Sequence, residues 1–169
     1  MRMSTDWLAA LTRFTSAVNR VFLTIAGIVI AIILAIITYD LVLRNVFDAP
    51  TLWALDFSRF LMVFAAFFAM APTLEHGQHV TVDLVEQMMK PGPKRIMQII
   101  ALTFVLIFAA FLMWQLTRTT IEAFEDDSLF PTVVPVKLKH VYWVGPLGIL
   151  QFILTAIVRL AAAIRTRPA

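Results

Sequence analysis

Four stretches of the chain contain no charged residue and are almost entirely apolar. They cover residues 21–39, 60–74, 96–117 and 141–158. A helix needs about 20 residues to cross the hydrocarbon core of a bilayer, which is roughly 30 Å thick. The second stretch reaches that length only when it is extended back to Leu52, which brings Asp56 and Arg59 into it. The pattern therefore predicts a single membrane domain over residues 1–169, with four transmembrane helices at about 21–43, 52–74, 94–117 and 140–160.

Composition supports a membrane location. Of the 169 residues, 60% are apolar and 15% are charged, whereas about half and about a quarter are usual in a soluble domain. A soluble four-helix bundle is the alternative, but its helices would each need a polar stripe. The stretch 96–117 offers only Gln98, Thr103 and Gln115 besides its last residue. The predicted fold class is therefore an all-α membrane protein.

The connections between the spans show patterns of their own. In the first twenty residues, apolar positions recur at helical spacing with Arg13 and Arg20 between them, which predicts a helix lying in the membrane interface and leading into the first span. Residues 82–90 also separate apolar from polar positions, which predicts a second interfacial helix, and the prolines of residues 91–93 end it. Prolines also favour extended backbone in the loop at 130–135.

The distribution of basic residues predicts the orientation, because cytoplasmic connections are enriched in Lys and Arg. The two ends of the chain and the middle connection hold nine of the 14 basic residues. The other two connections hold five, namely Arg44, Arg59, Arg118, Lys137 and Lys139. We therefore predict that the N- and C-termini are both cytoplasmic.

Residues that carry chemistry are scarce. The chain has no cysteine, which excludes a disulfide framework, a thiolate metal site and a cysteine nucleophile. His76 and His79 are three residues apart without the acid that a zinc protease motif places between its histidines, and no histidine lies inside a span where haem would need it. The basic residues are scattered, which disfavours nucleic acid. We therefore predict no enzyme, no catalytic, substrate-binding or metal site and no cofactor, with residues 75–79 forming a solvated cap.

Charges near the ends of the spans are more informative. Asp40 and Arg44 stand four residues apart with the acid first, the favourable order for a helical ion pair. Trp53, Asp56 and Arg59 share one face of the second span. Charged residues inside a membrane usually face protein or water, so Asp56 and Arg59 are candidates for a contact between helices or subunits. A local ion pair at headgroup depth, with Trp53 as an aromatic anchor, is the alternative.

The chain resembles a known family in these segments. Residues 44–60, with Arg44, Trp53, Asp56 and Arg59, followed by an apolar helix and by residues 75–83 with His79 and Asp83, resemble the small membrane subunit (DctQ-like) of tripartite ATP-independent periplasmic (TRAP) transporters. The chain departs from the family pattern in two places. Leu55 replaces one of two acids usual after the tryptophan, and residues 64–70 lack a glycine common in the second span.

The resemblance implies a subunit of a complex in the bacterial inner membrane. In this family a much larger membrane subunit (DctM-like) moves the solute by an elevator-like motion driven by a sodium gradient, and a periplasmic solute-binding protein delivers an organic acid. The small subunit is then expected to hold no substrate and to act as a scaffold. Arg44, Trp53, Asp56, Arg59, His79 and Asp83 become candidates for a partner interface or for a structural role.

Two other functions remain as alternatives. A stand-alone small four-helix transporter would be expected to place an ionisable residue near the middle of a span, and the four spans show none. A membrane anchor subunit of a redox enzyme would need ligands for its cofactor. Exposed apolar faces would meet membrane lipid or a large partner equally well, and the phenylalanines expected on them are Phe64, Phe67, Phe68, Phe104, Phe108 and Phe111.

Overall fold

The computed structural model describes residues 3–76, 91–126, 129–130 and 135–165. The helices in these ranges are α1 (Met3–Val46), α2 (Ala54–Glu75), α4 (Pro91–Glu125), α5 (Lys139–Tyr142) and α6 (Val144–Arg165). Four stretches are long and apolar enough to cross a membrane, at Trp7–Val46, Ala54–Glu75, Arg95–Glu125 and Lys139–Arg165. The predicted all-α fold with four transmembrane helices is confirmed. The interfacial helix expected at 82–90 lies outside the described residues.

Helix α1 is much longer than a membrane crossing requires. Its 44 residues extend about 66 Å at about 1.5 Å per residue, roughly twice the hydrocarbon thickness. It contains no proline and a single glycine, Gly27, so nothing in its sequence breaks the helix between residue 3 and the span. The helix predicted for the first twenty residues is therefore present from Met3, but it continues the first span without the bend that a separate interfacial helix would need.

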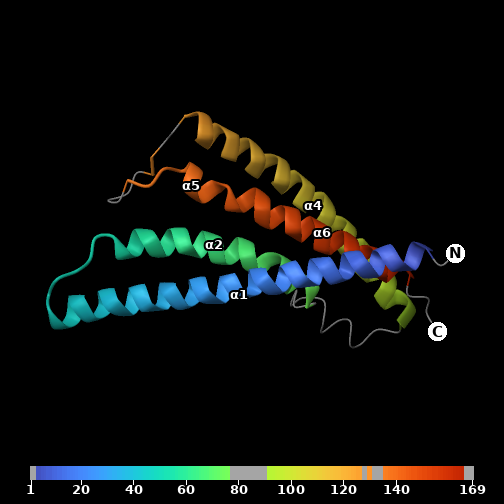
Figure 1. Ribbon diagram of the computed structural model, residues 1–169, viewed down its shortest axis with the longest axis horizontal. Helices are drawn as coiled ribbons and strands as arrows, with labels where there is room; N and C mark the ends of the chain where they lie inside the picture. Colours follow the sequence, from blue (N-terminus) through green and yellow to red (C-terminus); the bar gives the residue numbers. More distant parts are fainter. Residues whose placement is uncertain (1–2, 77–90, 127–128, 131–134, 166–169) are drawn as a thin grey trace.

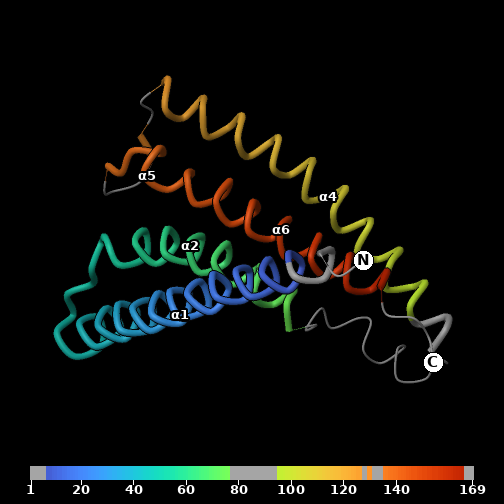
Figure 2. The backbone as a smooth tube through the Cα atoms, turned by 45° about the vertical axis from the view of Figure 1, so that its right-hand side comes forward, coloured from blue at the N-terminus to red at the C-terminus, as the bar shows by residue number. Residues whose placement is uncertain are grey.

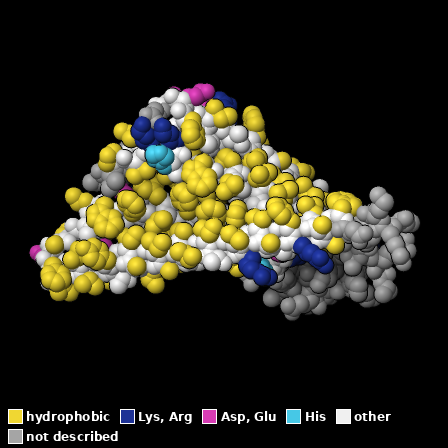
Figure 3. Space-filling model, in the orientation of Figure 1, with side chains coloured by type: hydrophobic (Ala, Val, Ile, Leu, Met, Phe, Trp, Pro, Cys, Tyr) yellow, Lys and Arg dark blue, Asp and Glu magenta, His cyan; other side chains and the backbone are white. Residues whose placement is uncertain are grey.

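The four long helices form an open layer. Helix α1 packs against α2, α2 packs against α6, and α6 packs against α4, while the N-terminal part of α1 also meets α6 (Figures 1 and 2). In the most apolar stretch of each helix, 44% of α6 and 33% of α2 are buried, against 11% of α4 and 6% of α1. The two outer helices therefore expose much of their apolar surface, and hydrophobic side chains are spread across the face shown in Figure 3.

Two apolar clusters hold the layer together. One joins α2, α4 and α6, and its buried members are Ala71, Leu74, Leu102, Ala109, Phe152, Ala156 and Ala163. The other joins α1, α2 and α6, where Phe68 meets Phe22 edge to face with ring centroids 5.0 Å apart. Of the phenylalanines expected on exposed faces, Phe68 is therefore in the core, whereas Phe104, Phe108 and Phe111 on α4 are exposed.

Helix α6 approaches the backbone of α2 closely at a glycine, Gly148. A Cβ atom placed on Gly148 would lie 2.8 Å from both the Cβ atom and the backbone oxygen of Phe67. Close approach of backbones through small residues is a common way for membrane helices to associate, since lipid provides no hydrophobic force between them. Gly148 therefore sets the spacing of the two central helices.

The start of α1 and the end of α6 lie at the same end of the layer, opposite the connections that follow α1 and α4 (Figure 1). This arrangement suits a chain that crosses the membrane four times.

We predict from the basic residues that single cysteines replacing Ser4, Gly92 and Thr166 resist a membrane-impermeant thiol reagent in intact cells, and that one replacing Asp127 is labelled. The native chain has no cysteine, so background labelling is absent. Labelling of position 92 from outside would contradict the predicted orientation.

Candidate functional site

The densest group of buried polar side chains joins α1, α2 and α6 towards the end where the chain begins and ends. We call it the polar junction, and its members are Thr15, Ser16, Asn19, Glu75, Gln151 and Thr155. Asn19 lies at its centre with only 1% of its surface exposed. Thr15, Gln151 and Thr155 are also buried, and Glu75 is partly buried.

Hydrogen bonds in the polar junction connect all three helices. The Nδ2 group of Asn19 donates to Glu75 Oε2 at 2.6 Å and to Thr155 Oγ1 at 3.1 Å. Gln151 Nε2 donates to Asn19 Oδ1 at 2.8 Å. The hydroxyl of Ser16 donates to the second carboxylate oxygen of Glu75. Asn19 thus uses both of its amide hydrogens and its carbonyl oxygen, which is the full set of bonds that this side chain requires when buried.

The geometry of the polar junction suits helix packing rather than chemistry. Each donor of Asn19 already has an acceptor, and both oxygens of Glu75 accept bonds from α1. Within the described ranges, no three His, Asp or Glu side chains come close enough to hold a metal ion. The expectation of a solvated cap over residues 75–79 is wrong for Glu75, because its carboxylate bonds to two side chains of α1.

The α1 and α6 members of the polar junction were not predicted from the sequence. A signal was available in α6, where Gln151 and Thr155 are four residues apart and therefore lie on one helical face within an otherwise apolar stretch. Asn19 lies two residues before the predicted first span. Polar residues are common at such positions, so this position carried no signal of burial. Its burial follows from the continuous α1, which carries it against α6.

A second polar group stabilises the connection between α1 and α2. The predicted ion pair is confirmed, with Arg44 Nη2 3.0 Å from Asp40 Oδ2. The other oxygen of Asp40 accepts bonds from the backbone nitrogen of Thr51, at 2.9 Å, and from its hydroxyl. Asp48 takes the left-handed conformation at φ 51° in this turn, which Asp tolerates better than most residues. Asp40 therefore ties the end of α1 to the chain entering α2.

The charged residues of α2 occupy different environments. Asp56 is buried, whereas the side chain of Arg59 is 67% exposed, and their closest atoms, Arg59 Nη1 and Asp56 Oδ1, are 3.6 Å apart. Trp53 lies between the rings of Tyr39 and Phe57, at centroid distances of 6.4 Å and 6.0 Å. The structure thus brings these residues onto one end of α2 but encloses only Asp56. His79 and Asp83 lie outside the described residues.

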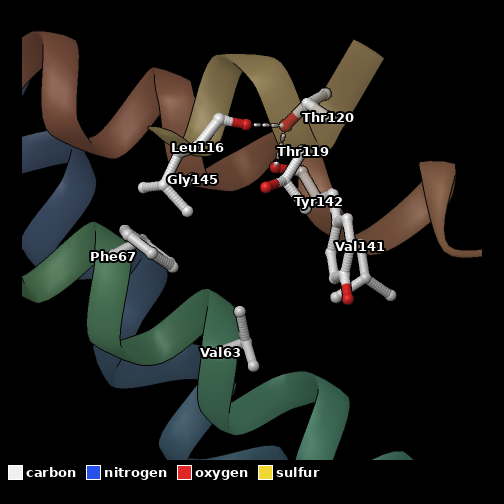
Figure 4. A pocket seen from close by; sticks show the side chains of 8 residues that line it. All are labelled: Val63, Phe67, Leu116, Thr119, Thr120, Val141, Tyr142 and Gly145. Atoms are coloured by element: carbon white, nitrogen blue, oxygen red, sulfur yellow. Dashed lines mark hydrogen bonds between the residues drawn. The ribbon is translucent and has the colours of Figure 1, made fainter. Parts of the chain in front are cut away.

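A cavity of about 240 Å³ lies between α2, α4 and the α5–α6 segment. Its lining, shown in Figure 4, comprises Val63, Phe67, Leu116, Thr119, Thr120, Val141, Tyr142 and Gly145. The Thr120 hydroxyl donates to the backbone oxygen of Leu116 at 2.7 Å and contacts that of Tyr142 at 3.3 Å. Without a charged residue in its lining, this cavity provides no counter-ion for an organic anion.

These features define an α-helical multi-pass membrane protein whose buried polar groups connect its own helices. The sequence matches the family model of the DctQ component of tripartite ATP-independent periplasmic transporters over residues 33–166. Because the match covers most of the chain, the protein belongs to the DctQ family. No curated protein matches the chain. The family is a component of transporters rather than a family of enzymes, and its members lie in the inner membrane.

Membership in the DctQ family identifies the chain as the small subunit of a TRAP transporter. It also implies association with a large DctM subunit and a solute-binding protein. The resemblance noted in the sequence is thereby confirmed. The matched range includes Arg44, Trp53, Asp56, Arg59, His79 and Asp83.

Proposed function

We propose that this subunit is a scaffold that braces the large DctM-type subunit in the membrane and holds no solute itself. The transporter as a whole would take up an organic acid, delivered by the periplasmic binding protein and driven by a sodium gradient. The scaffold role rests on one contrast: hydrogen bonds and a close backbone contact hold the central helices together, whereas the outer helices expose apolar surface. The polar junction ties the start of α1 to α2 and α6, and the Gly148 contact joins α2 to α6, while the rest of α1 and most of α4 present apolar surface outward.

The distribution of polar groups supports this role over that of a solute carrier. A transport pathway through a membrane needs polar or ionisable groups that can bind and release a solute. In the described spans, Asn19 and Gln151 bond to each other, and Asn19 also bonds to Glu75. Side chains that are occupied in this way stabilise the fold and offer no site for a passing anion.

We propose structural roles for three of the candidate residues. Arg44 stabilises the α1–α2 connection through Asp40, and Trp53 anchors the start of α2 at the headgroup level between Tyr39 and Phe57. Asp56 is buried in the first turn of α2, where its negative charge favours the positive end of the helix dipole. His79 and Asp83 stay proposed contacts with a partner, on the resemblance alone.

The scaffold proposal predicts that transport needs the other subunits. Reconstitution of this chain alone into liposomes should give no uptake of the solute, with or without an inward sodium gradient. Co-reconstitution with the large membrane subunit and the binding protein should give sodium-dependent uptake. Uptake is measured with radiolabelled solute, and liposomes with the large subunit and binding protein but without this chain serve as the matched control. Uptake by the isolated chain, or full uptake in that control, would contradict the proposal.

A further inference from the structure

An apolar groove runs along α1 and α2 on the surface of the layer. Its volume is about 620 Å³. Its walls include Ile30, Ile33 and Ile37 of α1 and Ala65, Ala66 and Ala69 of α2. The isoleucines recur at helical spacing, and the alanines leave room between the two helices. The groove is therefore a continuous hydrocarbon surface, with Arg59 contributing a charge to its lining.

The position of Arg59 makes one end of the groove charged and leaves the rest apolar. Arg59 is six residues after Trp53, so its backbone lies about 9 Å deeper than the proposed headgroup anchor, at the end of the layer that holds the α1–α2 connection. A snorkelling arginine side chain covers that distance and brings its charge to the headgroup level. Ala69 is ten residues further along the same helix, a distance of about 15 Å. That length is about half of the roughly 30 Å hydrocarbon core. From Arg59 towards the middle of the membrane, the groove therefore extends over about the depth of one lipid leaflet.

The polar end of the groove has unused hydrogen-bonding capacity. Arg59 has five N–H donors, its side chain is 67% exposed, and its nearest approach to Asp56 is 3.6 Å, longer than a direct hydrogen bond. An acceptor-rich anion at this end would satisfy the guanidinium, and phosphate matches its fork of donors.

We propose that this groove binds one phospholipid, with its phosphate on Arg59 and an acyl chain between the isoleucines of α1 and the alanines of α2. The phosphate of a lipid lies at headgroup depth, where a snorkelling arginine reaches it. A transmembrane helix of a partner protein could also pack on the alanines, but its apolar flank would leave the guanidinium of Arg59 without an acceptor, whereas a lipid phosphate supplies one. Inorganic phosphate would use Arg59 but leave the apolar groove empty. The proposal does not depend on the scaffold role.

The experiment is native mass spectrometry of the purified full-length chain in detergent, titrated with dioleoyl-phosphatidylglycerol. Ala66→Phe fills the middle of the groove at an exposed position, and Arg59→Gln removes the charge. Each variant should reduce the affinity for the lipid about tenfold, the effect expected for a lost bond to a charged group or for a blocked apolar site. Inorganic phosphate added in excess should not displace the lipid.

Matched substitutions on α4 provide the controls. Ala110→Phe makes the same change at another exposed position, and Arg118→Gln removes a guanidinium that is 63% exposed and paired with Glu122. Both should bind lipid as the wild type does. Wild-type lipid binding by Arg59→Gln, or by Ala66→Phe, overturns the proposal. So does loss of co-purification with the large subunit in Ala66→Phe while lipid binding is kept, because the groove would then hold a protein helix.

Discussion

Gly148→Ala is expected to destabilise the protein by about 1–3 kcal/mol, the usual effect of forcing an extra carbon into a packed interface. The added Cβ atom would lie 2.8 Å from the backbone oxygen of Phe67. A backbone atom cannot rotate away as a flexible side chain can, so α2 and α6 must separate along their contact. Thermal unfolding in detergent measures the effect, and Tm should fall by several degrees, since 1 kcal/mol shifts Tm by about 2–4 °C in a chain of this size.

Gly27→Ala is the matched control. Gly27 lies within α1, and a Cβ atom there would meet nothing within 4 Å. The same substitution should leave Tm unchanged or raise it, because alanine is better than glycine inside a helix by about 1 kcal/mol. If the two variants unfolded at the same temperature, Gly148 would not set the spacing between α2 and α6.

The membrane spans could be predicted because they depend on local composition. Charge-free stretches locate the hydrocarbon core directly, and extending the second stretch to Leu52 came within two residues of the start of α2 at Ala54. Hydropathy does not show where a helix ends once it has left the membrane. Helix α4 continues to Glu125, past the predicted limit at 117, because Arg118, Thr119 and their neighbours are compatible with a helix in water.

The orientation of the first twenty residues could not be predicted for a similar reason. An amphipathic pattern with helical spacing indicates a helix, but the same pattern suits a helix lying on the membrane and one that extends a span. The distinction depends on whether the backbone bends near residue 20. The apolar face of this segment carries Thr15 and Asn19 onto α6, a contact that depends on tertiary structure.

Polar contacts within one helix could be predicted from the sequence, whereas those between distant segments could not. The pair of Asp40 and Arg44 follows from their spacing along one helix, and it was predicted. The bonds from Thr51 to Asp40 cross a turn, and the bond from Gln151 to Asn19 joins residues from opposite ends of the chain. Such contacts depend on how helices are rotated about their axes, which the composition of a span does not specify.

Asn19→Leu should have the second large effect, because it removes the centre of the polar junction while keeping a side chain of similar size. Gln151 loses an acceptor at 2.8 Å and keeps only its longer bond to the backbone oxygen of Thr15, at 3.3 Å, while Glu75 Oε2 loses its donor at 2.6 Å. Buried polar groups left without partners destabilise a protein by about 1–3 kcal/mol, although single hydrogen bonds between membrane helices average only about 0.6 kcal/mol. A fall in Tm of several degrees is therefore expected, measured by thermal unfolding in detergent.

A double-mutant cycle separates the polar junction from simple packing. In Asn19→Leu/Gln151→Leu both partners are apolar, so the second substitution should destabilise much less than Gln151→Leu does alone, with a coupling of about 0.5–3 kcal/mol. Thr103→Val is the control, because the hydroxyl of Thr103 is exposed and bonds only to the backbone oxygen of Ile99 in its own helix. It should leave Tm nearly unchanged. Additive effects of the two leucine substitutions would show that Asn19 and Gln151 do not act together, and the polar junction would then not be what connects α1 to α6.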